Sequence, residues 1–149
     1  MLTPVTKDYE LYLGSTFFDR LIWWNKSGKA KITDSSGTLT EGSPIDLTYA
    51  RIRMQWRLTK IPDPKNPDNL ILDLDSSREI EVTHQNIETG IKIVDPKIGH
   101  FTITVSADDT AKIDYDLIRA VYYDLEIEID GYVYTVMKGK VKFRPQITI

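Results

Sequence analysis

The sequence predicts an all-β fold: an antiparallel β-sandwich of roughly eight to nine strands, immunoglobulin-like or jelly-roll-like in arrangement. Hydrophobic and polar residues alternate along most of the chain, which is the spacing of a strand with one buried face, and helical spacing is nearly absent. The apolar stretches are short and separated by turn residues, which favours a sandwich over an open sheet. The length of 149 residues, without a change of composition along it, indicates a single domain over residues 1–149.

In the first half of the chain, strands are expected at Tyr9–Leu13, Thr16–Trp24, Lys29–Thr33, Ile45–Leu47 and Arg51–Thr59. The last of these has the clearest alternation. Its core-facing residues are Ile52, Met54, Trp56 and Leu58, and its solvent-facing residues are Arg51, Arg53, Gln55 and Arg57. Three prolines follow within residues 61–69. Because proline removes a backbone donor and favours extended or turn conformations, this segment is predicted to be a protruding loop.

In the second half, strands are expected at Leu70–Leu74, Ile91–Ile93 and His100–Val105. A single helical turn is predicted at Ser106–Thr110, where the Ser106 side chain is suited to cap the first turn. The carboxylates of Asp108 and Asp109 suit the positive end of this turn, which explains them more simply than a metal site does.

The end of the chain predicts a hairpin. Strand Val121–Ile129 is followed by Asp130-Gly131, a pair typical of a type I′ turn, and then by a return strand from Tyr132 to about Phe143. Val141 and Phe143 have the wrong parity to face the core with Tyr134 unless one extra residue intervenes. A β-bulge is therefore expected near Met137–Gly139. Residues 144–149 are expected to form an extended tail, since Pro145 discourages continuation of a central strand.

Several classes of chemistry find no support in the sequence. There is no cysteine, no phosphate-binding glycine loop and no metal-ligand spacing around His84 or His100, so no catalytic residue, metal site or cofactor is expected. The formal net charge of −3 argues against a nucleic-acid partner, and no apolar stretch is long enough to suggest a membrane partner. The N-terminus does not resemble a secretory signal, so synthesis in a cytoplasm is expected.

Paired acids on strands resemble catalytic dyads at first sight. Asp73 and Asp75 share one face, and so do Glu126 and Glu128. General acid catalysis needs a carboxyl group that burial keeps neutral, whereas these residues alternate away from the apolar set. They are interpreted as solubilising acids, facing Lys138, Lys140 or Lys142 on a neighbouring strand.

Two further features concern the surface. Trp23 and Trp24 are adjacent on a strand and face opposite ways, so one ring is expected in the core and the other either against another subunit or covered by the chain itself. The outward row Arg51, Arg53 and Arg57 is interpreted as a solvated face or as a contact with an acidic partner. Aromatic residues suited to base stacking are not interleaved with it.

The order of the motifs resembles a family of small β-sandwich proteins of tailed-bacteriophage virions, related in style to the N-terminal domains of upper baseplate proteins. The resemblance spans most of the chain. It is carried by Leu13-Gly14-Ser15-Thr16-Phe17, Trp23-Trp24, residues 44–48 (PIDLT), residues 50–57 (ARIRMQWR), residues 99–110 (GHFTITVSADDT), residues 123–127 (YDLEI), Gly139-Lys140-Val141 and residues 145–148 (PQIT). This resemblance implies a virion building block, and it brings no catalytic residues with it.

The expected function is therefore non-enzymatic: a baseplate, tail or connector adaptor that binds neighbouring virion proteins or fibres in a multi-copy symmetric assembly. Alternatives are a head decoration or neck protein of the virion, or a carbohydrate-binding module with an aromatic platform of Trp23 or Trp24 with Tyr132 or Tyr134, which makes a host glycan the less favoured partner. The candidate interface residues are Trp23, Trp24, Pro62, Pro64, Pro67, Pro145, Ile147 and Ile149.

Overall fold

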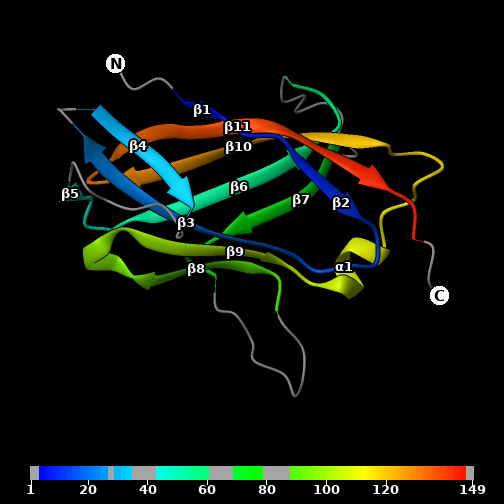
Figure 1. Ribbon diagram of the computed structural model, residues 1–149, viewed down its shortest axis with the longest axis horizontal. Helices are drawn as coiled ribbons and strands as arrows, with labels where there is room; N and C mark the ends of the chain where they lie inside the picture. The colour runs from blue at the N-terminus through cyan, green and yellow to red at the C-terminus, as the bar shows by residue number, and fades with distance from the viewer. Residues whose placement is uncertain (1–3, 27–28, 35–42, 61–68, 79–87, 147–149) are drawn as a thin grey trace.

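The computed structural model describes residues 4–26, 29–34, 43–60, 69–78 and 88–146, and it has two β-sheets packed face to face (Figure 1). The first sheet has the order β1-β11-β10-β6-β7, with β2 also paired to β11. Its strands are β1 (Val5–Thr6), β2 (Tyr9–Tyr12), β6 (Arg51–Arg57), β7 (Leu70–Asp75), β10 (Ala120–Ile129) and β11 (Tyr132–Arg144). The prediction of an all-β sandwich is confirmed at this level.

The second sheet has the order β4-β3-β9-β8, with β5 also paired to β3. Its strands are β3 (Phe17–Lys26), β4 (Lys29–Asp34), β5 (Ser43–Pro44), β8 (Gly90–Asp95) and β9 (His100–Val105). Of the eleven strands in the described residues, nine are four residues or longer, which agrees with the expected number. A short 3₁₀ helix, η2 (Pro96–Ile98), joins β8 to β9, and α1 (Ala107–Ala111) follows β9.

The helical turn forms as predicted and fixes one end of the sandwich. The Ser106 side chain caps α1 by accepting a hydrogen bond from the backbone N–H of Asp109 at 3.2 Å. Buried Thr110 donates its hydroxyl to the carbonyl of Ser15 at 2.7 Å and accepts from the N–H of Gly14 at 3.0 Å. The turn between β2 and β3 is thereby held against α1, as the two lie side by side in Figure 1.

Trp56 lies at the centre of the core, between the sheets. It is fully buried, and it meets the ring of Phe17 edge-on at 5.5 Å and the ring of Phe143 at 6.0 Å. The inward alternation of Ile52, Met54 and Trp56 is as predicted. The hydrophobic side chains of both sheets form one continuous cluster around it.

Two expectations for the first half of the chain are wrong. Leu58 does not face the core but is 38% exposed, because β6 ends at Arg57 and its pairing with β7 shifts register after Trp56. Ile45–Leu47 is not a strand, since only the preceding Ser43–Pro44 pairs with β3. Leu47 is nevertheless buried, and its N–H bonds the carbonyl of Pro96 at 2.8 Å, so this segment is held by loop carbonyls rather than by a sheet ladder.

The hairpin of β10 and β11 turns at Asp130-Gly131, and both residues have positive φ as a type I′ turn requires. The expected extra residue is present, but it is Val136 rather than Met137–Gly139. Leu125 pairs with Met137 and Glu126 with Thr135, so Val136 is the bulged residue, and Val136 and Met137 are both buried.

Gly139 has a different role from the one expected. A Cβ at this position would overlap the carbonyl oxygen of Lys7 and lie 2.8 Å from Asp8 Oδ1. The lack of a side chain therefore allows close approach of the N-terminal segment to β11, and it is not needed for the bulge.

The N-terminal segment departs from a purely antiparallel sandwich because β1 and β2 both run parallel to β11. The two strands keep one register along β11, and Lys7 and Asp8 interrupt it. The Lys7 carbonyl accepts a hydrogen bond from the buried hydroxyl of Tyr123 at 2.5 Å, while the Asp8 carboxylate accepts from the N–H of Lys140 at 2.9 Å. Burial raises the pKa of Tyr123, so its hydroxyl stays protonated as the donor.

Candidate binding groove

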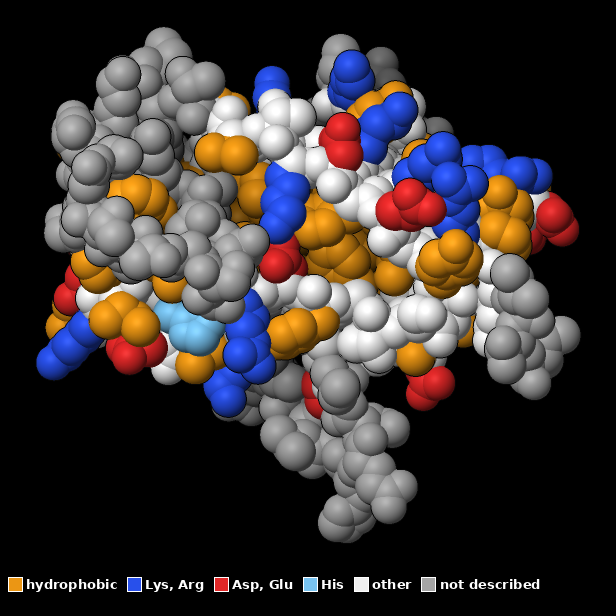
Figure 2. Space-filling view, viewed as in Figure 1, with side chains coloured by type: hydrophobic (Ala, Val, Ile, Leu, Met, Phe, Trp, Pro, Cys, Tyr) orange, Lys and Arg blue, Asp and Glu red, His pale blue; other side chains and the backbone are white. Residues whose placement is uncertain are grey.

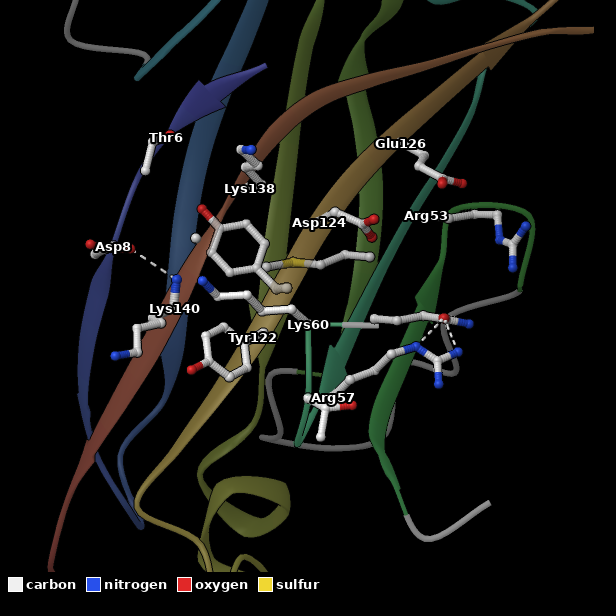
Figure 3. Close-up of a pocket in the computed structure, with 15 residues that line it drawn as sticks. Thr6, Asp8, Arg53, Arg57, Lys60, Tyr122, Asp124, Glu126, Lys138 and Lys140 are labelled. Carbon is white, nitrogen blue, oxygen red and sulfur yellow. Dashed lines mark hydrogen bonds between the residues drawn. The ribbon is translucent and has the colours of Figure 1, made fainter. Parts of the chain in front are cut away.

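A concave groove of about 630 Å³ lies on the outer face of the first sheet (Figure 3). Because side chains alternate along a strand, β6, β10 and β11 each project every second residue onto this face. The outward side chains that line the groove are Arg53, Gln55, Arg57, Tyr122, Asp124, Glu126, Lys138 and Lys140. Thr6 and Asp8 border it on the side of β1, and Thr59 and Lys60 border it beyond the end of β6.

Tyr122 is the central aromatic residue of the groove. Its strand lies between β6 and β11, so its Cα is paired with that of Arg57 on one side and that of Lys140 on the other. The ammonium groups of Lys60 and Lys140 lie 5.5 and 5.7 Å from the centroid of its ring. The half-buried ring therefore sits between two cations that approach it from opposite neighbouring strands.

The five cations of the groove lack carboxylate partners among the described residues, whereas other lysines and arginines of the protein are paired. Arg57 donates only to the neutral side-chain oxygen of Gln55, from Nε at 3.2 Å and from one terminal nitrogen at 2.6 Å. Arg53 has a buried Nε without a hydrogen-bond partner. The groove thus combines five unpaired cations with three carboxylates, those of Asp8, Asp124 and Glu126.

Arg51, the first member of the predicted arginine row, is not part of the groove. Its guanidinium binds the carboxylate of Asp75 on β7, at 3.1 Å from Nε to each oxygen. Asp75 also accepts from the backbone N–H and the hydroxyl of Ser77, at 2.9 and 2.8 Å. Asp73 binds Arg78 at 2.8 Å, so the acids of β7 hold the sheet edge together rather than forming a dyad.

The Asp75 cluster predicts a pH-dependent stability. Hydrogen bonds from Arg51 hold the pKa of the Asp75 carboxyl far below its ordinary value of 3.8. A carboxyl whose pKa is lower in the folded state stabilises the fold above its unfolded-state pKa, and that contribution is lost as the pH falls towards the folded-state value. We expect the free energy of unfolding, measured by urea titration, to decrease below about pH 4 and Asp75→Asn to reduce this slope.

A matched control for that experiment is Arg20→Gln, which removes a cation that makes no ion pair with a described residue. An unchanged slope in Asp75→Asn, or an equal reduction in Arg20→Gln, would show that the Arg51–Asp75 pair does not cause the acid sensitivity.

Glu126 and Glu128 do not face the lysines of β11, which corrects the earlier interpretation. The two-residue turn pairs Glu126 with Thr135 and Glu128 with Val133, while the other neighbours of these acids are Arg53 and Arg51 on β6. The lysines lie further along β11, opposite Asp124, Tyr122 and Ala120.

The candidate interface residues are scattered. Trp23 is 3% exposed, and its ring lies 5.7 Å from that of Tyr134 across the two sheets, so these two rings face the core and form no outward platform for a sugar. Trp24 is half-buried and Pro145, just after β11, is exposed. The remaining candidates lie outside the described residues: Pro62, Pro64, Pro67, Ile147 and Ile149.

Sequence reasoning did not identify the groove, although a signal for it was present. Within the single row Arg51, Arg53 and Arg57 no aromatic residue is interleaved, but Tyr122 of the adjacent strand supplies one. The hairpin turn together with a one-residue bulge is sufficient to pair Tyr122 with Lys140. The register of the hairpin was thus the signal, and the pairing of β6 with β10 was not available from the sequence.

No protein-family model and no curated protein matched the sequence when the chain was compared with both. Among the described residues, no helix is long and apolar enough to cross a membrane, and no group of three or more histidine or acidic side chains is placed to hold a metal ion.

Proposed function

We propose that the protein is a non-enzymatic structural component of a tailed-phage virion, built on an immunoglobulin-like or jelly-roll-like sandwich. It acts as a baseplate, tail or connector adaptor that binds neighbouring virion proteins or fibres in a multi-copy assembly. Its binding surfaces are the groove, the exposed edges of the sandwich and the segments at 61–69 and 144–149.

The observation that carries this proposal is a contact between two of the sequence motifs that resemble the virion family. The motif Leu13–Phe17 forms the turn from β2 to β3, and residues 99–110 form β9 and α1. Thr110 of the second motif binds Gly14 and Ser15 of the first, more than ninety residues earlier in the chain. The motifs thus work together as one structural joint, which supports reading them as a set rather than as independent strands.

The surface supports a role in binding. Large hydrophobic side chains are exposed at separate places on the described surface, among them Tyr49, Leu117, Tyr132 and Val133. Figure 2 shows such side chains in the middle of one face and towards the end where α1 lies. Aromatic and aliphatic side chains of this kind are the usual anchors of protein–protein interfaces.

The proposal is tested by following the protein into particles. In a culture that produces it, we expect mass spectrometry of gradient-purified particles to find the chain in a constant ratio to the other virion proteins. Deleting residues 145–149, or replacing residues 61–69 with a short glycine–serine link, should leave the fold intact by circular dichroism and reduce incorporation.

Failure to find the parent chain in purified particles would overturn the proposed function. If the chain is found but both variants incorporate as well as the parent, these two segments are not interfaces. The position of the chain in tail fractions, as opposed to head fractions, distinguishes an adaptor from a head decoration or neck protein, and binding in a glycan screen would favour a carbohydrate-binding module.

A further inference from the structure

We propose that the groove over β6, β10 and β11 binds an extended, carboxylate-rich segment of a partner protein. This inference rests on the proposed function, because it names the chemistry of the neighbour that the adaptor holds. Its basis is the charge arrangement of the groove and not the overall charge of the chain, which is −3.

The arrangement of the cations favours carboxylate ligands. Lys138 and Lys140 project two residues apart from β11, and Arg53 and Arg57 project from β6 on the other side of β10. The floor between these rows is Tyr122 and Asp124 of β10, and Figure 3 shows the cations on both sides of it. A strand or extended segment that lies along β10 would place acidic side chains within reach of both rows.

The unmet hydrogen-bonding capacity points the same way. The Nε of Arg53 is buried without an acceptor, and the ammonium groups of Lys60 and Lys140 contact a π-face instead of a carboxylate. A carboxylate forms a charge-assisted hydrogen bond with either group, which is stronger than these present contacts. Tyr122 then provides a flat apolar surface on which the backbone or an apolar side chain of the partner packs.

The three carboxylates of the groove favour a polypeptide over a nucleic acid. Asp8, Asp124 and Glu126 lie among the cations, and they would repel the continuous negative charge of a phosphate backbone. A protein segment avoids this repulsion because it can place backbone N–H groups or a basic side chain opposite them. Mixed charge with an excess of cations is thus complementary to a predominantly acidic peptide.

The direct test measures binding of a short fluorescein-labelled poly-glutamate peptide to the purified full chain by fluorescence anisotropy at low salt. We expect saturable binding that weakens as salt is added, because the contacts are exposed charges. The double variant Lys60→Glu with Lys140→Glu should bind at least about tenfold more weakly. Tyr122→Ala should weaken binding, and Tyr122→Phe, which keeps the ring, should retain it.

The matched control is Lys92→Glu with Lys97→Glu. It makes the same change of net charge at exposed positions of β8 and η2, in the other sheet. We expect this variant to bind within about twofold of the parent, because screening limits the influence of distant surface charges. Thermal unfolding of every variant establishes that it is folded before binding is compared.

The competing outcomes are distinct. No saturable binding by the parent, or equal losses in the two double variants, would overturn the groove as the site. Tighter binding of oligo-dT through Lys60 and Lys140 would show that the ligand is a nucleic acid, and the acidic-peptide proposal would be wrong. Particle incorporation separates this inference from the proposed function: a parent chain that enters particles as well as its groove variants do leaves the virion role standing without the groove.

Discussion

Trp56→Ala is expected to lower the free energy of unfolding by about 3–5 kcal/mol, through lost burial and the cavity left behind. The indole is fully buried between the sheets, in contact with the rings of Phe17 and Phe143. Those two residues come from β3 and from the end of β11, so the cavity would open where both sheets and the last strand meet. Urea titration followed by circular dichroism measures the change.

The matched control for this substitution is Tyr132→Ala, which removes an aromatic ring that is 69% exposed at the hairpin. We expect it to change stability by no more than about 0.5 kcal/mol, as is usual for surface substitutions. A loss below about 1 kcal/mol in Trp56→Ala would mean that the core does not depend on this side chain.

Gly99→Ala is expected to cost about 2–5 kcal/mol, because a positive backbone φ and a steric overlap act at the same residue. Gly99 has φ 69°, and an added Cβ would overlap the carbonyl oxygen of Trp23 and lie 3.0 Å from that of Ile45. The Trp23 carbonyl accepts from the N–H of Ile45 at 2.9 Å, so relief of the overlap would disturb this junction of three segments.

Gly131→Ala separates the two causes. Gly131 has φ 82° in the hairpin turn, but an added Cβ there meets nothing within 4 Å. It should therefore cost only the backbone penalty of about 1–2 kcal/mol. Equal losses in Gly99→Ala and Gly131→Ala, measured by the same urea titration, would show that close packing around Gly99 contributes nothing.

The strands could be predicted wherever a single property decided the conformation. Period-two alternation was sufficient for β6, β9, β10 and the hairpin turn, because burial of one face imposes it. It failed at Leu58 and at Ile45–Leu47, where apolar residues continue after the ladder has ended. Where a strand stops depends on its neighbours: Leu58 donates its N–H to the carbonyl of Asn69, at the start of the segment that leads into β7.

The candidate site was less predictable than the fold, because it belongs to no single segment. Asp75, Arg51 and Ser77 looked like two surface features in the sequence, and the pairing of β6 with β7 joins them in one cluster. Lys60 gave no signal of its own, since its relation to Tyr122 depends on the order of strands within the sheet. Strand order between distant segments is a property of the whole fold, and local alternation carries little information about it.

The parallel pairing of the N-terminal segment with β11 sets the order in which the protein is completed. Val5 pairs with Met137, and Tyr9 pairs with Val141, so the first strands made on the ribosome have no partner until almost the whole chain has emerged. Contacts this distant in sequence form late and slowly, because a long loop must close before they are gained. During synthesis the edge of β11 and the waiting N-terminal strand are both unpaired, and two nascent chains held close together are therefore able to exchange this strand.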